Sequence, residues 1–151
     1  MFNDDNQAVL MLCSTVAASD SYDLRPLSAR EWSELSRKIG ASALGAAGAL
    51  LGLGVSEIAS ELEIPPGDAE RIHHLLDAGK SIDLELDRLA SLGITPVTCI
   101  DDSYPTRLRE SLKQVAPPVL FAGGKLALLN QGGVAVVGSR SLDERGTSFA
   151  E

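Results

Sequence analysis

The sequence is poor in aromatic side chains, in cysteine and in positive charge. Aromatic residues make up 4% of the 151 residues, and the two cysteines, Cys13 and Cys99, match no metal-ligand spacing. Two distant thiols are typical of small buried side chains in a reducing compartment, so we expect neither a metal centre nor a disulfide. The chain carries 13 Lys and Arg against 21 Asp and Glu, a formal net charge of −8. This balance argues against a large DNA-binding surface, since such surfaces are usually basic.

The sequence also lacks a secretory signal and a long apolar span. Residues 1–5 are acidic where a signal peptide would be basic. Residues 39–55 carry no charge, but they are rich in Ala and Gly and fall short of the roughly 20 apolar residues that cross a bilayer. We therefore expect a soluble, cytoplasmic protein without membrane contact.

The first 92 residues have the spacing of short helices. Ser28, with Glu31 three residues later, predicts a capping box ahead of apolar residues at intervals of three and four. The apolar run 8–13 is either a short helix or a strand. The further helices are expected over about 41–51, over 57–62 capped by Ser56, from a cap at Asp68 onward, and over 82–92. Together they predict an all-helical N-terminal domain, residues 1–92.

The spacing of the apolar residues changes from helical to strand-like after Gly93. Strands are expected over 94–100, 117–124 and 133–138, with a helix from Pro105 to about residue 112 after the first strand and a short helical turn after the second. The third run is apolar throughout, as in strands buried on both faces of a parallel sheet. The predicted fold class is α+β to α/β. Residues 93–151 would begin a Rossmann-like, three-layer α/β domain.

The strongest signal for binding lies where the third strand ends. Gly138, Ser139 and Arg140 follow this strand, and Gly146 stands where the next helix would open. A strand that turns into a helix N-terminus presents free backbone N–H groups to a phosphate, and Arg140 adds a planar guanidinium. An ordinary turn, with Arg140 solvated or paired to a nearby carboxylate, stays open as the alternative. Neither a G-x-G-x-x-G nor a complete G-x-x-x-x-G-K-[ST] pattern is present.

Three segments, in order, resemble the DprA/Smf family of DNA-processing proteins. A tyrosine–proline pair followed by leucine, a proline-x-leucine-aromatic-x-glycine strand and a glycine–serine–arginine turn with a later glycine are typical of that family. Here the segments are 94–108 with Tyr104 and Pro105, 117–123, and 134–140 with Gly146.

The resemblance implies a function that composition does not. Proteins of this family bind single-stranded DNA through a Rossmann-like domain, help to load the RecA recombinase in natural transformation, act as dimers, and are not known as enzymes. It places Gly138, Ser139 and Arg140 at the DNA-binding pocket, whereas we expect a structural role for Tyr104 and Pro105. It implies no cofactor. It also implies further strands, a second glycine-rich segment and basic residues beyond the sequence given.

Other functions remain as alternatives. The same turn could hold the phosphate of a small nucleotide, as in a Rossmann-like sensor or hydrolase, or the helical part could be an interaction module. Residues 56–64 and the next helix are similar to the opening of a helix-turn-helix, but acidic residues share the second helix with Arg71, so duplex reading is not favoured. His73 and His74 point about 100° apart on a helix and do not chelate one metal together. No nucleophile with an attendant base is evident, so we expect no catalytic site.

Overall fold

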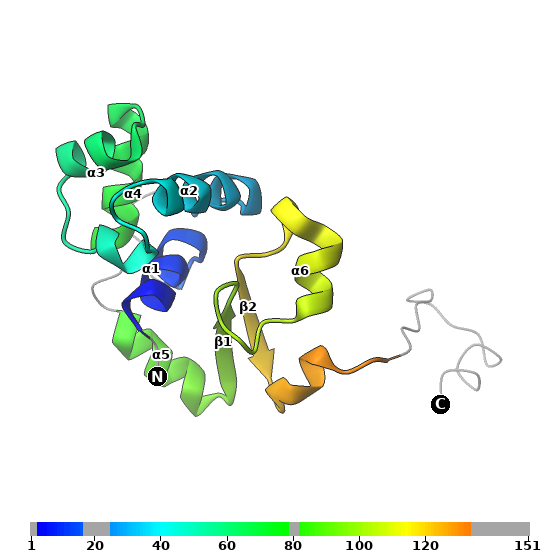
Figure 1. The fold of residues 1–151 in the computed structure, drawn as a ribbon. Helices are drawn as coiled ribbons and strands as arrows, with labels where there is room; N and C mark the ends of the chain where they lie inside the picture. The colour runs from blue at the N-terminus through cyan, green and yellow to red at the C-terminus, as the bar shows by residue number, and fades with distance from the viewer. Residues whose placement is uncertain (1–2, 17–24, 79–81, 134–151) are drawn as a thin grey trace, which may run out of the picture.

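The computed structural model describes residues 3–16, 25–78 and 82–133, and all structural statements below concern them. These residues form six α-helices, three short 3₁₀ helices and two strands, a mixed α+β arrangement (Figure 1). None of these helices has the length and apolar character needed to span a membrane. The elements are α1 (Asp4–Cys13), α2 (Ala29–Ala41), η1 (Ala47–Leu50), α3 (Val55–Leu62), α4 (Pro66–Ala78), α5 (Ile82–Ser91), β1 (Ile94–Thr98), α6 (Thr106–Leu112), η3 (Lys113–Val115), β2 (Val119–Gly123) and η4 (Leu126–Asn130).

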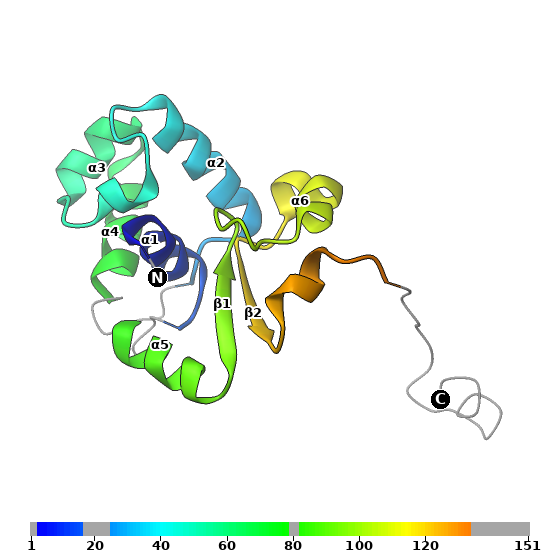
Figure 2. The same cartoon turned by 60° about the horizontal axis from the view of Figure 1, so that its bottom comes forward.

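Helix α1 forms the centre of the core. Its residues Val9, Leu10 and Leu12 are fully buried, and it contacts η1, α4 and both strands. A helix that packs on several sides carries apolar residues around most of its circumference, which is why the run 8–13 lacks helical periodicity. Figures 1 and 2 show α1 between the other helices and the sheet. The alternative of helix or strand is therefore settled in favour of a helix.

The capping box of α2 is confirmed, whereas the two other predicted caps are wrong. Glu31 Oε2 accepts from the Ser28 backbone N–H at 2.7 Å, and Ser28 Oγ accepts from the Glu31 N–H at 3.4 Å. Helix α3 begins at Val55, one residue before Ser56, because the Glu57 carboxylate accepts from the Gly54 N–H at 2.8 Å. Helix α4 begins at Pro66, since proline lacks only an N–H that a first helical turn leaves free. Asp68 therefore lies in that first turn.

The helix expected over 41–51 is wrong in most of its length. Beyond Ala41, the last residue of α2, only η1 is helical there, because Gly45 takes a left-handed φ of +70° that interrupts a helix. Gly48 passes so close to α1 that a Cβ would lie 2.8 Å from Cβ of Asp4. The Gly48 N–H donates to Asp5 Oδ1 at 2.6 Å. Contact with α1 therefore determines the shape of this segment.

The two strands pair antiparallel, with Val97 opposite Leu120. This pairing is not the parallel arrangement of a Rossmann-like sheet, so the described residues do not confirm that part of the predicted fold. Hydrogen bonds within the segment that connects β1 to β2 hold the strands in this arrangement. The Tyr104 hydroxyl donates to the Pro117 carbonyl at 2.7 Å, and the Cys99 N–H donates to the Pro118 carbonyl at 2.8 Å. These bonds place the start of β2 beside the end of β1. The expected strand 133–138 lies, apart from Gly133, outside the described residues.

The sheet lies between the layer of helices α1–α5 and helix α6 (Figures 1 and 2). The Thr98 hydroxyl donates to Asn6 Oδ1 at 2.6 Å, and the indole N–H of Trp32 donates to Cys99 Sγ at 3.1 Å. Direct bonds thus cross from residues 1–92 to residues 93–133. The division into two domains at residue 92 stays a prediction.

Candidate nucleic-acid interface

The turn after β1 is held by a buried polar network. Asp101 Oδ2 accepts from the Thr98 N–H at 2.6 Å and lies 3.0 Å from the Thr98 hydroxyl, and Asp101 Oδ1 accepts from the Asn6 side-chain amide at 3.0 Å. Thr98 is fully buried. Asp101 therefore closes the end of the strand and ties it to α1. Its oxygens are occupied by protein donors, which is a structural use of the carboxylate.

Tyr104 anchors the next part of the connection. Its side chain is 1% exposed, and its hydroxyl binds the Pro117 carbonyl. The Arg109 guanidinium lies 5.2 Å from the ring centroid and donates to the Cys99 carbonyl at 2.7 Å. Burial raises the pKa of the Tyr104 hydroxyl, so it remains a donor at neutral pH. The expected structural role of Tyr104 is confirmed.

Asn130 brings the chain back to α6 after β2. Its side-chain oxygen accepts from the Thr106 N–H at 2.8 Å, and so it caps a helix whose own N-cap, Pro105, has no side-chain hydrogen bond. Arg107 lies close to the segment that follows, because a Cβ at Gly132 would stand 3.8 Å from Nη1 of Arg107. The residues that precede the predicted phosphate turn therefore start beside an exposed arginine.

Charge is divided unevenly along the chain. Residues 1–92 contain seven Lys and Arg against 15 Asp and Glu, whereas residues 93–151 contain six of each. The whole net charge of −8 therefore belongs to the helical part, and the objection that it raised to DNA binding does not apply to residues 93–151. Within 103–133 the charged residues are Arg107, Arg109, Lys113, Lys125 and the single acid Glu110.

These basic residues were missed because the charge was counted over the whole chain. A count by segment would have found them. Arg107, Lys113 and Lys125 are exposed, whereas Arg109 is engaged with Cys99 and Tyr104. Exposed cations of this kind can neutralise phosphates of a nucleic acid without reading its sequence.

The predicted phosphate-binding residues Gly138, Ser139, Arg140 and Gly146 lie outside the described residues. Among 3–16, 25–78 and 82–133 there is no group of three or more His, Cys, Asp and Glu side chains that could hold a metal.

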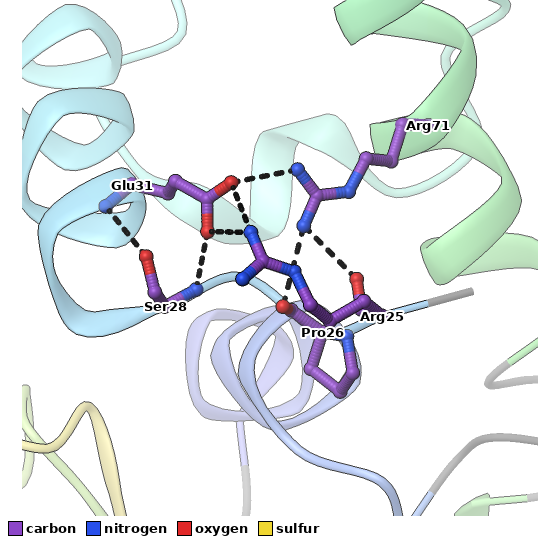
Figure 3. Close-up of polar contacts among 5 residues, drawn as sticks. All are labelled: Arg25, Pro26, Ser28, Glu31 and Arg71. Carbon is purple, nitrogen blue, oxygen red and sulfur yellow. Dashed lines mark hydrogen bonds and ion pairs between the residues drawn. The ribbon is translucent and has the colours of Figure 1, made fainter. Parts of the chain in front are cut away.

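The helix-turn-helix alternative loses its main basic residue. Arg71 of α4 donates to Glu31 Oε1 at 2.8 Å and to the backbone carbonyls of Arg25 and Pro26 at 3.0 and 3.3 Å (Figure 3). The Arg25 guanidinium also donates to both Glu31 oxygens, at 3.0 and 3.1 Å. Hydrogen bonds from Arg71 and Ser28 lower the pKa of Glu31 to about 2. Arg71 is thus used to join α4 to α2 and is not presented to a DNA groove.

The two histidines and the two cysteines have structural surroundings. The rings of His73 and His74 lie edge to face with centroids 6.0 Å apart, and His74 Nε2 lies 3.8 Å from the Glu70 carboxylate. Cys13 and Cys99 are free thiols, as expected, and burial raises the pKa of both. Thiols of raised pKa are poor nucleophiles at neutral pH.

The described residues thus define a mixed α+β protein in which an acidic helical layer packs on a two-stranded antiparallel sheet, with exposed cations in the segments that flank the strands. Residues 95–151 match the family model of DNA recombination-mediator protein A, DprA. The resemblance is confirmed for these residues, and the match supports a DprA-family protein with a general role in DNA recombination. The matched range includes all four predicted phosphate-binding residues. No curated protein and no solved structure matches the chain.

Proposed function

We propose that this chain belongs to a non-enzymatic DNA-processing protein that binds single-stranded DNA and assists the loading of the RecA recombinase. The observation that carries the proposal is the family match over 95–151, which includes the glycine–serine–arginine turn at 138–140. The balanced charge of this region and the exposed Arg107 support it. Dimerisation, a cytoplasmic location and a place in natural transformation are part of the proposal through the family alone.

In the proposed fold, residues 93–151 begin a Rossmann-like domain that follows the helical domain 1–92. The apolar run 133–138 is its proposed third strand, on the sequence pattern alone.

Arg140 is the proposed contact to the DNA backbone. A guanidinium fork binds two phosphate oxygens at once, and the backbone N–H groups of Gly138 and Ser139 would add donors at the start of the next helix. Contacts of this kind give affinity without sequence preference and a strong dependence on salt.

The test is fluorescence anisotropy of a labelled single strand of about 20 nucleotides, titrated with the whole chain at two salt concentrations. Arg140→Ala should weaken binding roughly tenfold and reduce the slope of log K against log salt by about 0.7, the value for one lost phosphate contact on a single strand. Arg145→Ala removes the same charge five residues away and serves as the matched control.

The outcomes separate the alternatives. Equal losses in the two variants would show general electrostatic attraction and contradict the proposed turn. Absence of binding by a chain that circular dichroism shows to be folded would place the DNA site outside this chain. Competition by a mononucleotide as strong as by the oligonucleotide would instead favour a nucleotide-binding sensor or hydrolase.

A further inference from the structure

Helix α2 and the 3₁₀ helix η3 are far apart in the sequence but pack against each other. Figures 1 and 2 show the N-terminal part of α2 beside the end of α6, where η3 begins. Residues 29–41 and 106–115, which form α2, α6 and η3, contain six Lys and Arg against three Asp and Glu. In a chain of net charge −8, these neighbouring elements are therefore locally basic.

Two arginines, Arg30 and Arg37, lie on the outer face of α2. They are seven residues apart, which is two helical turns, so both lie on one face at a spacing of roughly 10 Å. Trp32 and Ile39, each two positions further along and so roughly 200° around the helix, are buried. Both arginines are exposed, and neither forms an ion pair within the described ranges. Their guanidinium groups are therefore available to a ligand.

The acidic residues near these arginines do not cancel their charge. Glu34 stands between them along α2, but it lines a hollow that is shared with Asp68 and Ile72 of α4, and neither arginine lines that hollow. Glu34 thus belongs to the flank of α2 that faces α4. On the side of α6 and η3, Glu110 is the single acid among residues 103–133.

Lys113, the first residue of η3, adds a third cation where this helix packs against α2. It is exposed, and among the described residues it has no ion pair. Its backbone has φ +49° and ψ −117°, a conformation that glycine adopts freely and that other residues rarely adopt. Strain of this kind is often retained at functional sites. A lysine at this position therefore indicates a use for its ammonium group.

We propose that Arg30, Arg37 and Lys113 form a second contact surface for the phosphate backbone of single-stranded nucleic acid. Exposed, unpaired cations on neighbouring elements complement the repeated negative charge of such a ligand. A guanidinium fork binds two phosphate oxygens at once, which suits the two arginines to this contact. The inference rests on the proposed function, because it assigns a further part of the protein to the same ligand.

The test is fluorescence anisotropy of a labelled single strand of about 20 nucleotides, titrated with the whole chain at two salt concentrations. Arg30→Gln and Arg37→Gln should each weaken binding roughly threefold and reduce the slope of log K against log salt by about 0.7, the value for one lost phosphate contact. The control Arg88→Gln removes the same charge from α5, on the other side of α1 from α2 (Figures 1 and 2). It should change the affinity by less than about 1.5-fold.

Lys113→Gly separates the charge of this residue from its place in the fold. It should weaken binding roughly threefold while the urea midpoint stays the same or rises, because glycine adopts this φ without strain. Lys113→Arg should keep the affinity of the unaltered chain. An unchanged affinity in Lys113→Gly, or a loss that comes with a lower urea midpoint, would overturn the place of Lys113 in the surface.

The outcomes distinguish this inference from the proposed function. If Arg140→Ala weakens binding and the α2 variants behave like Arg88→Gln, the second surface is overturned and the turn at 138–140 stands. If the α2 variants weaken binding and Arg140→Ala does not, the surface is supported and the turn is contradicted. Absence of binding by the folded chain overturns both. Competition by polyglutamate as strong as by unlabelled DNA at equal charge would show attraction to any polyanion and overturn a nucleic-acid surface.

Discussion

The helical part, residues 1–92, and the strand part, by which we mean the two strands with their connection and η4 (residues 93–133), are stabilised in different ways. The helical part closes around α1, whose central side chains have no contact with solvent. The strand part exposes five large apolar side chains, Ile100, Leu112, Val115, Phe121 and Leu128, whereas the described residues of the helical part expose two, Leu84 and Leu92. The helical part carries the whole excess of negative charge, whereas residues 93–151 contain equal numbers of acidic and basic residues. The comparison indicates that the acidic helical part has its own core, whereas the stability of the strand part depends on contacts with the helices.

The largest effect is expected from the centre of the helical part. Leu10→Ala should lower the free energy of unfolding by about 3 kcal/mol, because it removes buried methyl groups and leaves a cavity. Urea denaturation followed by circular dichroism measures this change. Leu84→Ala, at a side chain that is 76% exposed, should cost less than about 0.5 kcal/mol. Similar losses in both variants would contradict the central place of α1.

A smaller effect is expected from the hydrogen bond between Thr98 and Asn6, one of those that join the two parts. Thr98→Val should cost about 2 kcal/mol, since it leaves the buried Asn6 amide and the half-buried Asp101 carboxylate without the hydroxyl between them. Hydrogen exchange should show the loss of protection mainly in β1 and β2. The exposed Thr95 of the same strand offers the matched variant Thr95→Val, which should change stability by less than about 0.5 kcal/mol. If the amide protons of β1 and β2 remain protected in Thr98→Val, the stability of the strand pair does not depend on its bond to α1.

The smallest effect is expected from the ion pairs of Glu31 with Arg25 and Arg71, and it depends on pH. The pKa of Glu31 lies at about 2 in the folded chain against 4.5 for the free side chain, so the ionised form favours folding. This contribution is fully present above pH 4.5 and is lost as the pH falls through 2. Because Glu31 is one-third exposed, we expect only about 1 kcal/mol at neutral pH.

Glu31→Gln tests this prediction by urea denaturation at several pH values. Its deficit relative to the unaltered chain should be largest above pH 4.5 and should shrink as the pH falls toward 2. A deficit independent of pH would mean that packing, rather than charge, holds α4 to α2. Glu34→Gln, on the next turn of α2, removes the same charge without breaking an ion pair among the described residues and should show little change.

Local interactions were the predictable part of the fold. Ser28 and Glu31 are three residues apart, so their reciprocal hydrogen bonds could be inferred from spacing alone. The starts of α3 and α4 were predicted two and three residues late. The Glu57 carboxylate binds the Gly54 N–H ahead of α3, and Pro66 opens α4, so neither helix starts from a Ser or Asp cap. The glycine–serine–arginine pattern at 138–140 is also local, and its assignment to DNA binding remains a prediction.

By itself the sequence determined the helical character of residues 28–40, the strands after Gly93, the family of residues 95–151 and the division of charge between the two parts. Only the tertiary structure decided that η1 replaces a longer helix, that β1 and β2 pair antiparallel, and that Asn130 caps α6. The physical reason is separation along the chain. Gly48 meets Asp4, and Thr106 meets Asn130 24 residues away, through contacts that no local periodicity encodes.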